Sequence, residues 1–420
     1  MQFPRMFQLR QHFDRTHLEN VAGAVREELA GLGLALRIRP GETVAITAGS
    51  RGIANIAKIL RTCVEFVAEL RAVPVLVPAM GSHGGATAAG QLGVLAHYGI
   101  TPERMGCEIR SSMETVVVGT TARGLPIHFD RHAWEADHTL IVNRIKPHTR
   151  FTGDIESGLH KMMLIGLGKE AGATVYHRAF ADLDFGTILN EAASQILSEC
   201  RIAGGLGIIE NAYDQTSRVV GVRPNEFRER EPVLLREARE KMPRLPFADC
   251  DLLIIDRIGK NISGAGFDTN VAGRKFDDKR STPSDLAQVR RIFVRGLTEE
   301  TDGNATGIGL ADFTNSRTVA NIDRRMTTIN CVTGAHPTAA AIPIHYPSDR
   351  EAIAAAFQTI GTRTAENAMI MQIANTLEIG EVWASEAYFA AAKADSRFEI
   401  LSPPQEMRLD AEGNLRGVGE

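Results

Sequence analysis

The hydrophobic positions of the first 100 or so residues follow two alternating patterns. Continuous apolar runs at residues 43–48 (TVAITA) and 73–78 (VPVLVP) predict buried strands. Apolar residues at three- and four-residue spacing predict helices over residues 18–36, 53–70 and 87–98. Because strand, loop and helix recur in this order, the pattern predicts an α/β fold with mostly parallel sheets.

The later patterns extend this plan and divide the chain into two α/β domains. We expect a domain over residues 1–245 that carries the binding loops, a domain over 246–420 that closes over it, and the active site in the cleft between them. The pattern also predicts a hairpin or meander over residues 107–129, strands over 137–143, 251–258 and 381–388, two strands within 204–222, helices over 176–200, 225–241 and 350–380, and a frayed tail from Asp410.

The composition resembles that of ordinary globular proteins, with 44% hydrophobic and 23% charged residues. A formal net charge of −4 provides no basic field, so we expect neither nucleic acid nor a membrane as partner. The five cysteines show no CxxC spacing, and no apolar run is long enough to span a bilayer. These features predict a cytoplasmic protein and leave homo-oligomerisation open.

Two glycine-rich loops follow the first two predicted strands. Residues 49–52 (GSRG) and 81–85 (GSHGG) come at the carboxyl ends of parallel strands, where ligands bind in α/β folds. The backbone N–H groups of such loops, together with Arg51, suit a phosphate or a carboxylate. His83 is flanked by glycines that would let a ligand come close. A plain turn and a solvated histidine are the alternative interpretations.

The densest group of titratable side chains lies between Asn143 and His177. Pro147 opposes helix formation and leaves His148 just past the end of a strand. Lys161 follows a Gly-Leu-His segment and precedes apolar residues, so partial desolvation would favour a neutral, nucleophilic amine. A surface lysine is the alternative. We expect this segment to bind a ligand.

Together these motifs resemble the nickel-pincer lactate racemase family, the racemases and epimerases of 2-hydroxy acids. The GTHR loop of the family is matched by residues 81–84 (GSHG), and its downstream PH by Pro147-His148. In the family, a nickel-ligating histidine follows the cofactor-bearing lysine by sixteen residues. Lys161 and His177 have the same spacing, since 177 − 161 = 16.

The resemblance implies a nickel-pincer nucleotide linked covalently to Lys161, Ni(II) ligated by His177, and cofactor-synthesis proteins as partners. The loop residues implied to contact the cofactor are Gly49, Ser50, Arg51, Gly81 and Ser82. The chain departs from the family at Ala48, where the family has aspartate, and at residues 157–161, which read SGLHK in place of SGGRK. The resemblance is close over roughly the first half of the chain and implies a changed substrate.

The implied reaction removes a hydride from the hydroxyl-bearing carbon and returns it to the other face, with the cofactor ring as hydride acceptor. A proton acceptor is needed on each side of that carbon, so His83 and His148 are the expected acid/base pair. Arg51 or Lys146 would hold the substrate carboxylate or the cofactor phosphate. Lys260, in a glycine-rich loop of the second domain, is a further substrate-binding candidate or a solvated loop lysine.

Two other functions fit the same residues. His83, His148 and His177 would hold zinc or iron in a hydrolase or lyase, although no HxH or HExxH spacing is present. A non-catalytic protein that stores or delivers the cofactor or a nucleotide would need Lys161 and His177 but neither of the other two histidines. His160, next to Lys161, either replaces the arginine of the family or packs in the interior.

Overall fold

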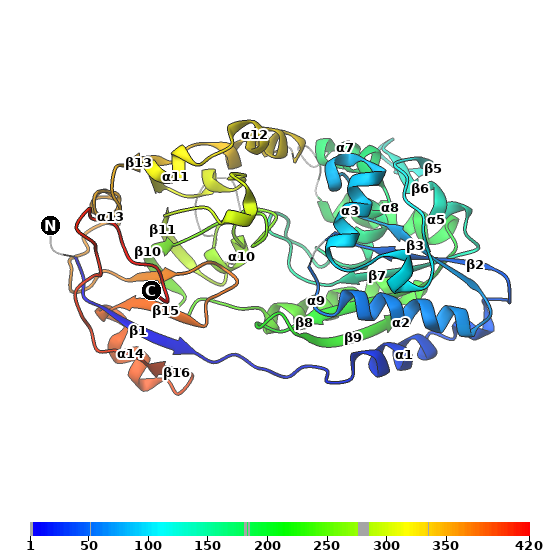
Figure 1. The fold of residues 1–420 in the computed structure, drawn as a ribbon, viewed down its shortest axis with the longest axis horizontal. Helices are drawn as coiled ribbons and strands as arrows, with labels where there is room; N and C mark the ends of the chain where they lie inside the picture. Colours follow the sequence, from blue (N-terminus) through cyan, green and yellow to red (C-terminus); the bar gives the residue numbers. More distant parts are fainter. Residues whose placement is uncertain (1–2, 51, 180–182, 184, 276–284, 335) are drawn as a thin grey trace. The chain divides into compact units, whose positions relative to one another are not determined.

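The computed structural model describes residues 3–50, 52–179, 183, 185–275, 285–334 and 336–420, which form two compact units (Figure 1). One unit is Asp14–Met242, and the other joins Met1–Phe13 to Pro243–Glu420. Strand β1 (Met6–Gln11) therefore belongs with the second half of the chain, where it pairs antiparallel with β15 (Glu381–Ser385). A single division at residue 245 does not account for this strand.

The Asp14–Met242 unit contains a six-stranded sheet in the order β4-β3-β2-β7-β8-β9, in which only the β8–β9 pair is antiparallel. Its strands are β2 (Thr43–Ala48), β3 (Val73–Pro78), β4 (Glu108–Ile109), β7 (His138–Arg144), β8 (Ile202–Glu210) and β9 (Thr216–Val222), and β5 (Thr115–Thr120) and β6 (Pro126–Asp130) form a separate hairpin. Its helices are α1 (Val21–Gly31), α2 (Ile56–Glu69), α3 (Ala88–His97), α4 (Pro102–Met105), α5 (Arg131–Glu135), α6 (Leu159–Lys161), a π-helix (Met162–Gly166), α7 (Lys169–Ala179), α8 (Phe185–Glu199) and α9 (Phe227–Lys241).

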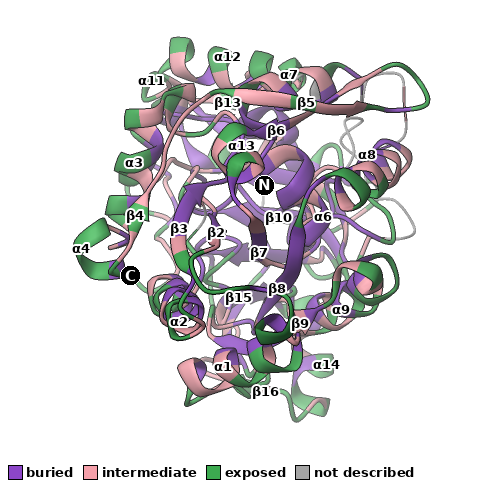
Figure 2. Ribbon diagram, turned by 90° about the vertical axis from the view of Figure 1, so that its right-hand side faces the viewer, coloured by how far each residue is buried: buried purple, intermediate pink, exposed green. Residues whose placement is uncertain are grey.

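Burial on both faces explains why β2 and β3 read as continuous apolar runs. Successive side chains of a strand point to opposite faces, so an alternating sequence suits a sheet covered on one side only. Here Val44 and Ile46 enter one core cluster and Ala45 enters the other, while Leu76 and Val75 divide in the same way. Both strands have the predicted bounds, and Figure 2 shows the central strands buried.

The helix predicted over residues 176–200 is wrong in its extent. His177 lies near the end of α7, and a separate helix, α8, begins at Phe185. Tyr176 packs in the same core cluster as Phe185, so the apolar spacing runs through both helices although the chain does not continue as one. The predicted metal ligand therefore lies on α7, which is separated from the Lys161 turn by the π-helix.

The second unit contains an eight-stranded sheet in the order β13-β12-β11-β10-β14-β15-β1-β16, parallel from β13 to β14 and antiparallel beyond. Its remaining strands are β10 (Asp249–Ile255), β11 (Gln288–Val294), β12 (Phe313–Asn315), β13 (Ile344–Tyr346), β14 (Ile370–Ile373) and β16 (Phe398–Ile400), and its helices are α10 (Thr269–Ala272), α11 (Ser316–Ala320), α12 (Arg324–Thr333), α13 (Asp349–Phe357) and α14 (Phe389–Ala394). The predicted α/β class is thus confirmed.

Two expectations for this unit are wrong. Residues 350–380 are not helical throughout, because β14 lies within them and pairs with β10. The segment after Asp410 is not frayed, since Leu415 is buried and its N–H donates to Asp349 Oδ2 at 3.0 Å. No helix in the described part of the chain has the length and apolar character needed to cross a bilayer.

Candidate functional site

Three adjacent parallel strands, β3, β2 and β7, end at the same edge of the first sheet. The chain leaves them through residues 79–87, 49–55 and 145–158, respectively. The topology therefore brings the three loops that carry most predicted site residues to one edge. Ser82, in the first of these loops, is half-buried, and its carbonyl accepts the Ala86 N–H at 3.1 Å.

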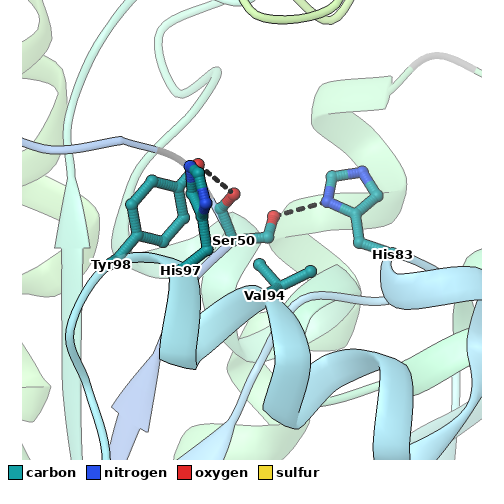
Figure 3. Close-up of a pocket in the computed structure, with 5 residues that line it drawn as sticks. All are labelled: Ser50, His83, Val94, His97 and Tyr98. Atoms are coloured by element: carbon teal, nitrogen blue, oxygen red, sulfur yellow. Dashed lines mark hydrogen bonds between the residues drawn. The ribbon is translucent and has the colours of Figure 1, made fainter. Parts of the chain in front are cut away.

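Ser50 and His83 meet across two of these loops. The Ser50 hydroxyl and His83 Nδ1 share a hydrogen bond, and the Tyr98 hydroxyl donates to the Ser50 carbonyl at 3.3 Å (Figure 3). These residues line a pocket of about 240 Å³, together with Val94 and His97 of α3. Because His83 is exposed, its imidazole is accessible to a small polar molecule at this place.

Glycines fold the His83 loop back onto the protein. Gly81 (φ 59°) and Gly84 (φ 69°) have left-handed backbones that favour glycine. A Cβ at Gly84 would lie 2.6 Å from the backbone nitrogen of Gln91, and one at Gly81 would lie 3.2 Å from the Ile165 carbonyl oxygen. The Gly81 N–H also donates to the Gly166 carbonyl at 3.2 Å. These two glycines are required for packing against α3 and the π-helix, a reason that the sequence did not reveal.

Lys161 ends the single turn of α6 and is half-buried. At the end of β7, Asn143 Nδ2 donates to the Gly158 carbonyl at 2.8 Å and so holds the start of this turn. A π-helix follows this turn. Helices of this kind are rare, and those that occur are often found at functional sites. Met162 Cε of the π-helix would lie 3.3 Å from a Cβ at Gly49. The segment that begins with the lysine turn thus packs against both glycine loops.

His160 is an anchor of this turn. It is buried, its Nδ1 lies 2.6 Å from Glu231 Oε2 of α9, and its N–H donates to the same oxygen at 3.1 Å. A Cβ at Gly158 would lie 2.0 Å from Glu231 Oε1, so the glycine leaves space for the carboxylate. Of the two interpretations of His160, interior packing therefore agrees with the structure.

The hydrogen bonds of His148 determine the position of its ring proton. Its Nδ1 accepts the backbone N–H groups of Arg150 at 3.1 Å and Phe151 at 3.2 Å. An N–H group can only donate, so the neutral ring carries its proton on Nε2. The ring also stacks on Phe151, with centroids 4.7 Å apart, and lies 6.1 Å from the ring of Phe185. In this conformation His148 can donate a hydrogen bond through Nε2.

Glu156 supports the His148 loop and was missed by the sequence analysis. Its side chain is fully buried, and its Oε2 accepts the His148 N–H at 2.7 Å. Its Oε1 accepts from Gly153 N at 3.1 Å and from Arg239 Nη2 at 2.6 Å. A single acidic residue in a polar loop gives no signal of burial, because its partners come from the loop backbone and from α9.

Lys146 lies in the same loop, where its N–H donates to the Ser157 carbonyl at 2.9 Å. Burial and the Glu210 carboxylate raise the pKa of Asp214, whereas the positive charges of Arg144 and Lys146 lower it. Lys146 is therefore near enough to Asp214 to influence it electrostatically. Its predicted contact with a substrate carboxylate stays a prediction.

Three further predicted residues are not placed at this edge by the structure. Arg51 lies outside the described residues, and so does the side chain of His177, although its backbone is part of α7. Lys260 belongs to the other unit, where its Nζ donates to the Gly264 carbonyl at 3.0 Å and its N–H to Thr301 Oγ1 at 3.0 Å. The roles of these three residues stay predictions.

No three His, Cys, Asp or Glu residues converge on a potential metal position among the described side chains. His83 and His148 thus form no such cluster with a third described residue. The interpretation as a zinc or iron enzyme depends on His177, whose side chain this statement does not cover.

Comparisons with known proteins bear on this same part of the chain. Residues 37–184 match the family model of the lactate racemase N-terminal domain, which confirms for this segment the resemblance drawn from the motifs. The structure of the lactate racemase apoprotein from Thermoanaerobacterium thermosaccharolyticum is similar at 12% identity and a TM-score of 0.49, over 93% of this chain and 92% of that one. No curated protein matches the chain.

Proposed function

We propose that this protein is a racemase or epimerase of a 2-hydroxy acid, including sugar acids, that works with a nickel-pincer nucleotide. The observation that carries the proposal is the meeting of three loops at one sheet edge, with the Ser50–His83 pair and the Lys161 turn, inside the segment that matches the lactate racemase N-terminal domain. A 2-hydroxy acid is small and polar, and a pocket of about 240 Å³ suits this class.

The residues at this edge fit the cofactor. Lys161 is half-buried on a turn that Asn143 and Glu231 hold in place, so a covalent anchor there would be rigid. His177, on the helix that follows, is the nickel ligand in this proposal, since imidazole is a common ligand of Ni(II). When bound, the cofactor supplies a hydride acceptor. Gly49, together with the His83 loop, would border the cofactor.

The two loop histidines divide the proton transfers. If His83 Nδ1 donates its proton to Ser50 Oγ, then the lone pair of the neutral ring is at Nε2, where it accepts the proton of the substrate hydroxyl. His148 is the proposed proton donor, and it must donate as the imidazolium, because donation from the neutral ring would leave an imidazolate. To become the imidazolium, His148 must first give up its two backbone hydrogen bonds and take up a proton at Nδ1. After Nε2 has donated, its lone pair accepts the hydroxyl proton in the reverse reaction. Arg51, Lys146 and Lys260 are the proposed groups that bind the substrate carboxylate and hydroxyls.

The first test is intact-protein mass spectrometry and nickel analysis on chain co-produced with cofactor-synthesis proteins. We expect a covalent adduct with one nickel per chain, and neither in Lys161→Ala. The matched control is Lys58→Ala, an exposed lysine of α2, which should load normally. His177→Ala should keep the adduct and lose nickel.

An unmodified mass in the wild-type chain, beside a lactate racemase that loads in the same cells, would overturn the proposal. Loaded protein is then screened against 2-hydroxy acids for loss of optical purity. His83→Ala should load fully and lose activity by about 10²-fold or more, as expected for a lost general base. Full activity in this variant would remove His83 from the proposed acid/base pair. A loaded wild-type chain that turns over none of the 2-hydroxy acids would leave a cofactor-carrying protein as the better interpretation.

A further inference from the structure

A buried polar network lies next to the His83 loop and has no part in the proposed chemistry. Lys169, the first residue of α7, and Gln91 of α3 are both completely buried. Lys169 Nζ lies 3.0 Å from Asp130 Oδ2, donates to Gln91 Oε1 at 3.2 Å, and also donates to the Pro78 carbonyl at the end of β3. One ammonium group therefore joins α7, α3, β3 and the end of β6.

The ammonium group of Lys169 determines which end of the Gln91 side-chain amide, the oxygen or the nitrogen, faces the His83 loop. Gln91 Nε2 donates to the Gly81 carbonyl at 2.9 Å and to the His83 carbonyl at 3.3 Å. A side-chain amide accepts at its oxygen and donates at its nitrogen. Because Lys169 donates to the oxygen, the nitrogen must face the loop. The backbone on both sides of Ser82 is thus held by a group whose orientation depends on Lys169.

Burying such a polar network costs more free energy than filling the same space with apolar side chains. A buried ammonium group is costly unless it is paired, and burial lowers the pKa of Lys169 although the Asp130 carboxylate opposes the shift. The backbone of Lys169 also has a φ of 54°, a value that residues other than glycine adopt rarely. A methionine would fill this space without a charge, so packing alone does not explain the residue.

We infer that Lys169 and Gln91 are positioning residues that hold the His83 loop in a defined place relative to α7, the helix of His177. The catalytic meaning of this contact rests on the proposed function, because only that function assigns roles to the two histidines. The contact between Gln91 and the loop does not depend on the proposed function. Loosening it should increase loop motion and reduce the turnover of the loaded enzyme.

Gln91→Glu tests the inference with a minimal change of shape. The carboxylate keeps an acceptor for Lys169 but loses both N–H bonds to the loop carbonyls. The matched control is Gln195→Glu on α8, which loses an N–H bond to the Thr120 carbonyl at the exposed end of the unit's hairpin. Hydrogen–deuterium exchange of the protein without cofactor is followed in peptides over residues 79–91 and over β8 and β9.

We expect about tenfold faster exchange in residues 79–91 of Gln91→Glu, as two lost hydrogen bonds imply, and unchanged exchange in β8 and β9. Gln195→Glu should leave residues 79–91 unchanged. Equal exchange in wild type and Gln91→Glu, or acceleration spread evenly over the unit, would overturn the inference. Gln91→Met, which cannot place a charge in the interior, repeats the test if Gln91→Glu folds poorly.

In loaded enzyme, Gln91→Glu should lower kcat with little change in KM, because the loop positions a proton-transfer group. An unchanged kcat beside a loosened loop would overturn the positioning role. If the wild-type chain takes up no cofactor, the proposed function fails, but the exchange experiment still decides whether Gln91 holds the loop.

Discussion

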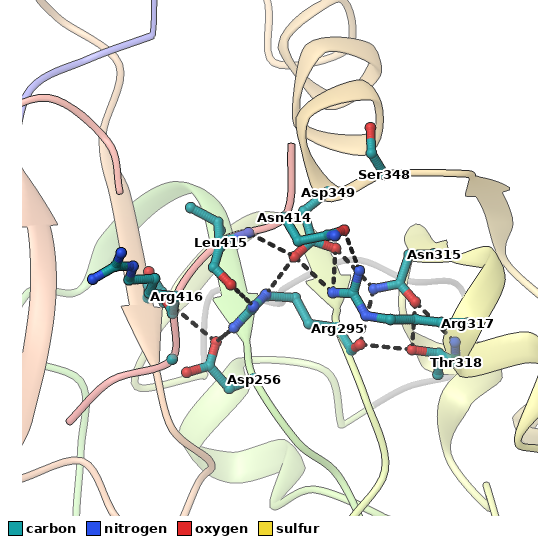
Figure 4. Close-up of polar contacts among 12 residues, drawn as sticks. Asp256, Arg295, Asn315, Arg317, Thr318, Ser348, Asp349, Asn414, Leu415 and Arg416 are labelled. Atoms are coloured by element: carbon teal, nitrogen blue, oxygen red, sulfur yellow. Dashed lines mark hydrogen bonds and ion pairs between the residues drawn. The ribbon is translucent and has the colours of Figure 1, made fainter. Parts of the chain in front are cut away.

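The carboxyl edges of the two parallel sheets carry different kinds of residue. In the Asp14–Met242 unit, glycine loops with Ser50 and His83 border a pocket. In the other unit, Asp256 follows β10 and Arg295 follows β11, and ion pairs and hydrogen bonds connect them with the end of the chain (Figure 4). The same position in an α/β fold is thus a candidate site in one unit and an anchor in the other.

Arg295, Asp256 and Asp349, which we call the anchor, hold the C-terminal segment through hydrogen bonds and ion pairs. Arg295 Nε lies 2.8 Å from Asp349 Oδ2, and its guanidinium also bonds the Leu415 carbonyl. Val418 N donates to Asp256 Oδ2 at 2.7 Å. Arginine stays charged across the ordinary pH range, which suits a permanent contact, whereas imidazole titrates near neutrality and suits proton transfer. The residue types at the two edges therefore agree with a structural contact in one unit and with the proton transfer that we propose for the other.

The largest effect is expected from breaking the anchor. Arg295→Met leaves the buried carboxylate of Asp256 without its ion-pair partner and leaves Asp349 paired with Arg317 alone, so it should lower the free energy of unfolding of its unit by about 3–5 kcal/mol. The control is Arg26→Met, which removes an exposed pair with Glu69 and should cost less than about 1 kcal/mol. Urea denaturation measures both. Similar losses would show that the anchor adds no more than a surface ion pair.

A smaller effect is expected from stiffening the glycine loop at the candidate site. Gly81→Ala and Gly85→Ala both introduce a side chain at a left-handed residue, at a cost of about 1–2 kcal/mol each. Only Gly81 lacks space, since its Cβ would approach the Ile165 carbonyl, whereas the Cβ at Gly85 meets no atom within 4 Å. Gly81→Ala should therefore be the less stable variant in urea and the slower to form the Lys161 adduct. Equal behaviour would contradict the packing argument.

The smallest effect concerns acid. Burial lowers the pKa of His128 on β6, whose Nδ1 lies 3.0 Å from Thr115 Oγ1. The unfolded chain then binds a proton near pH 6.5 while the folded chain does not, so stability is lost as the pH falls below about 6.5. Unfolding of the Asp14–Met242 unit, measured between pH 7 and pH 5, should show this loss. His128→Asn should reduce the slope, and an unchanged slope would exclude His128 as its source.

Local signals were sufficient where one element was long, apolar and bounded by glycine or proline. Strands β2 and β3 have the predicted residues because both faces are buried and the runs are uninterrupted. The predictions of one helix over residues 176–200 and of helices throughout residues 350–380 were wrong, because apolar spacing reveals neither a break in a helix nor the pairing partner of a strand such as β14. For the site, proximity of the Ser50 and His83 loops followed from parallel topology, but Glu156 and Gln91 gave no signal.

The α/β class, the strand–loop–helix order of the first half and the residue types available for chemistry could be predicted without a structure, because they follow from local periodicity and composition. Three features became apparent only from the folded chain: β1 joins the second sheet, His160 pairs with Glu231 in the interior, and Arg295 holds the C-terminal segment. Each of these depends on partners many residues away along the chain. A side chain becomes buried, paired or accessible through such partners, and a single sequence does not specify them.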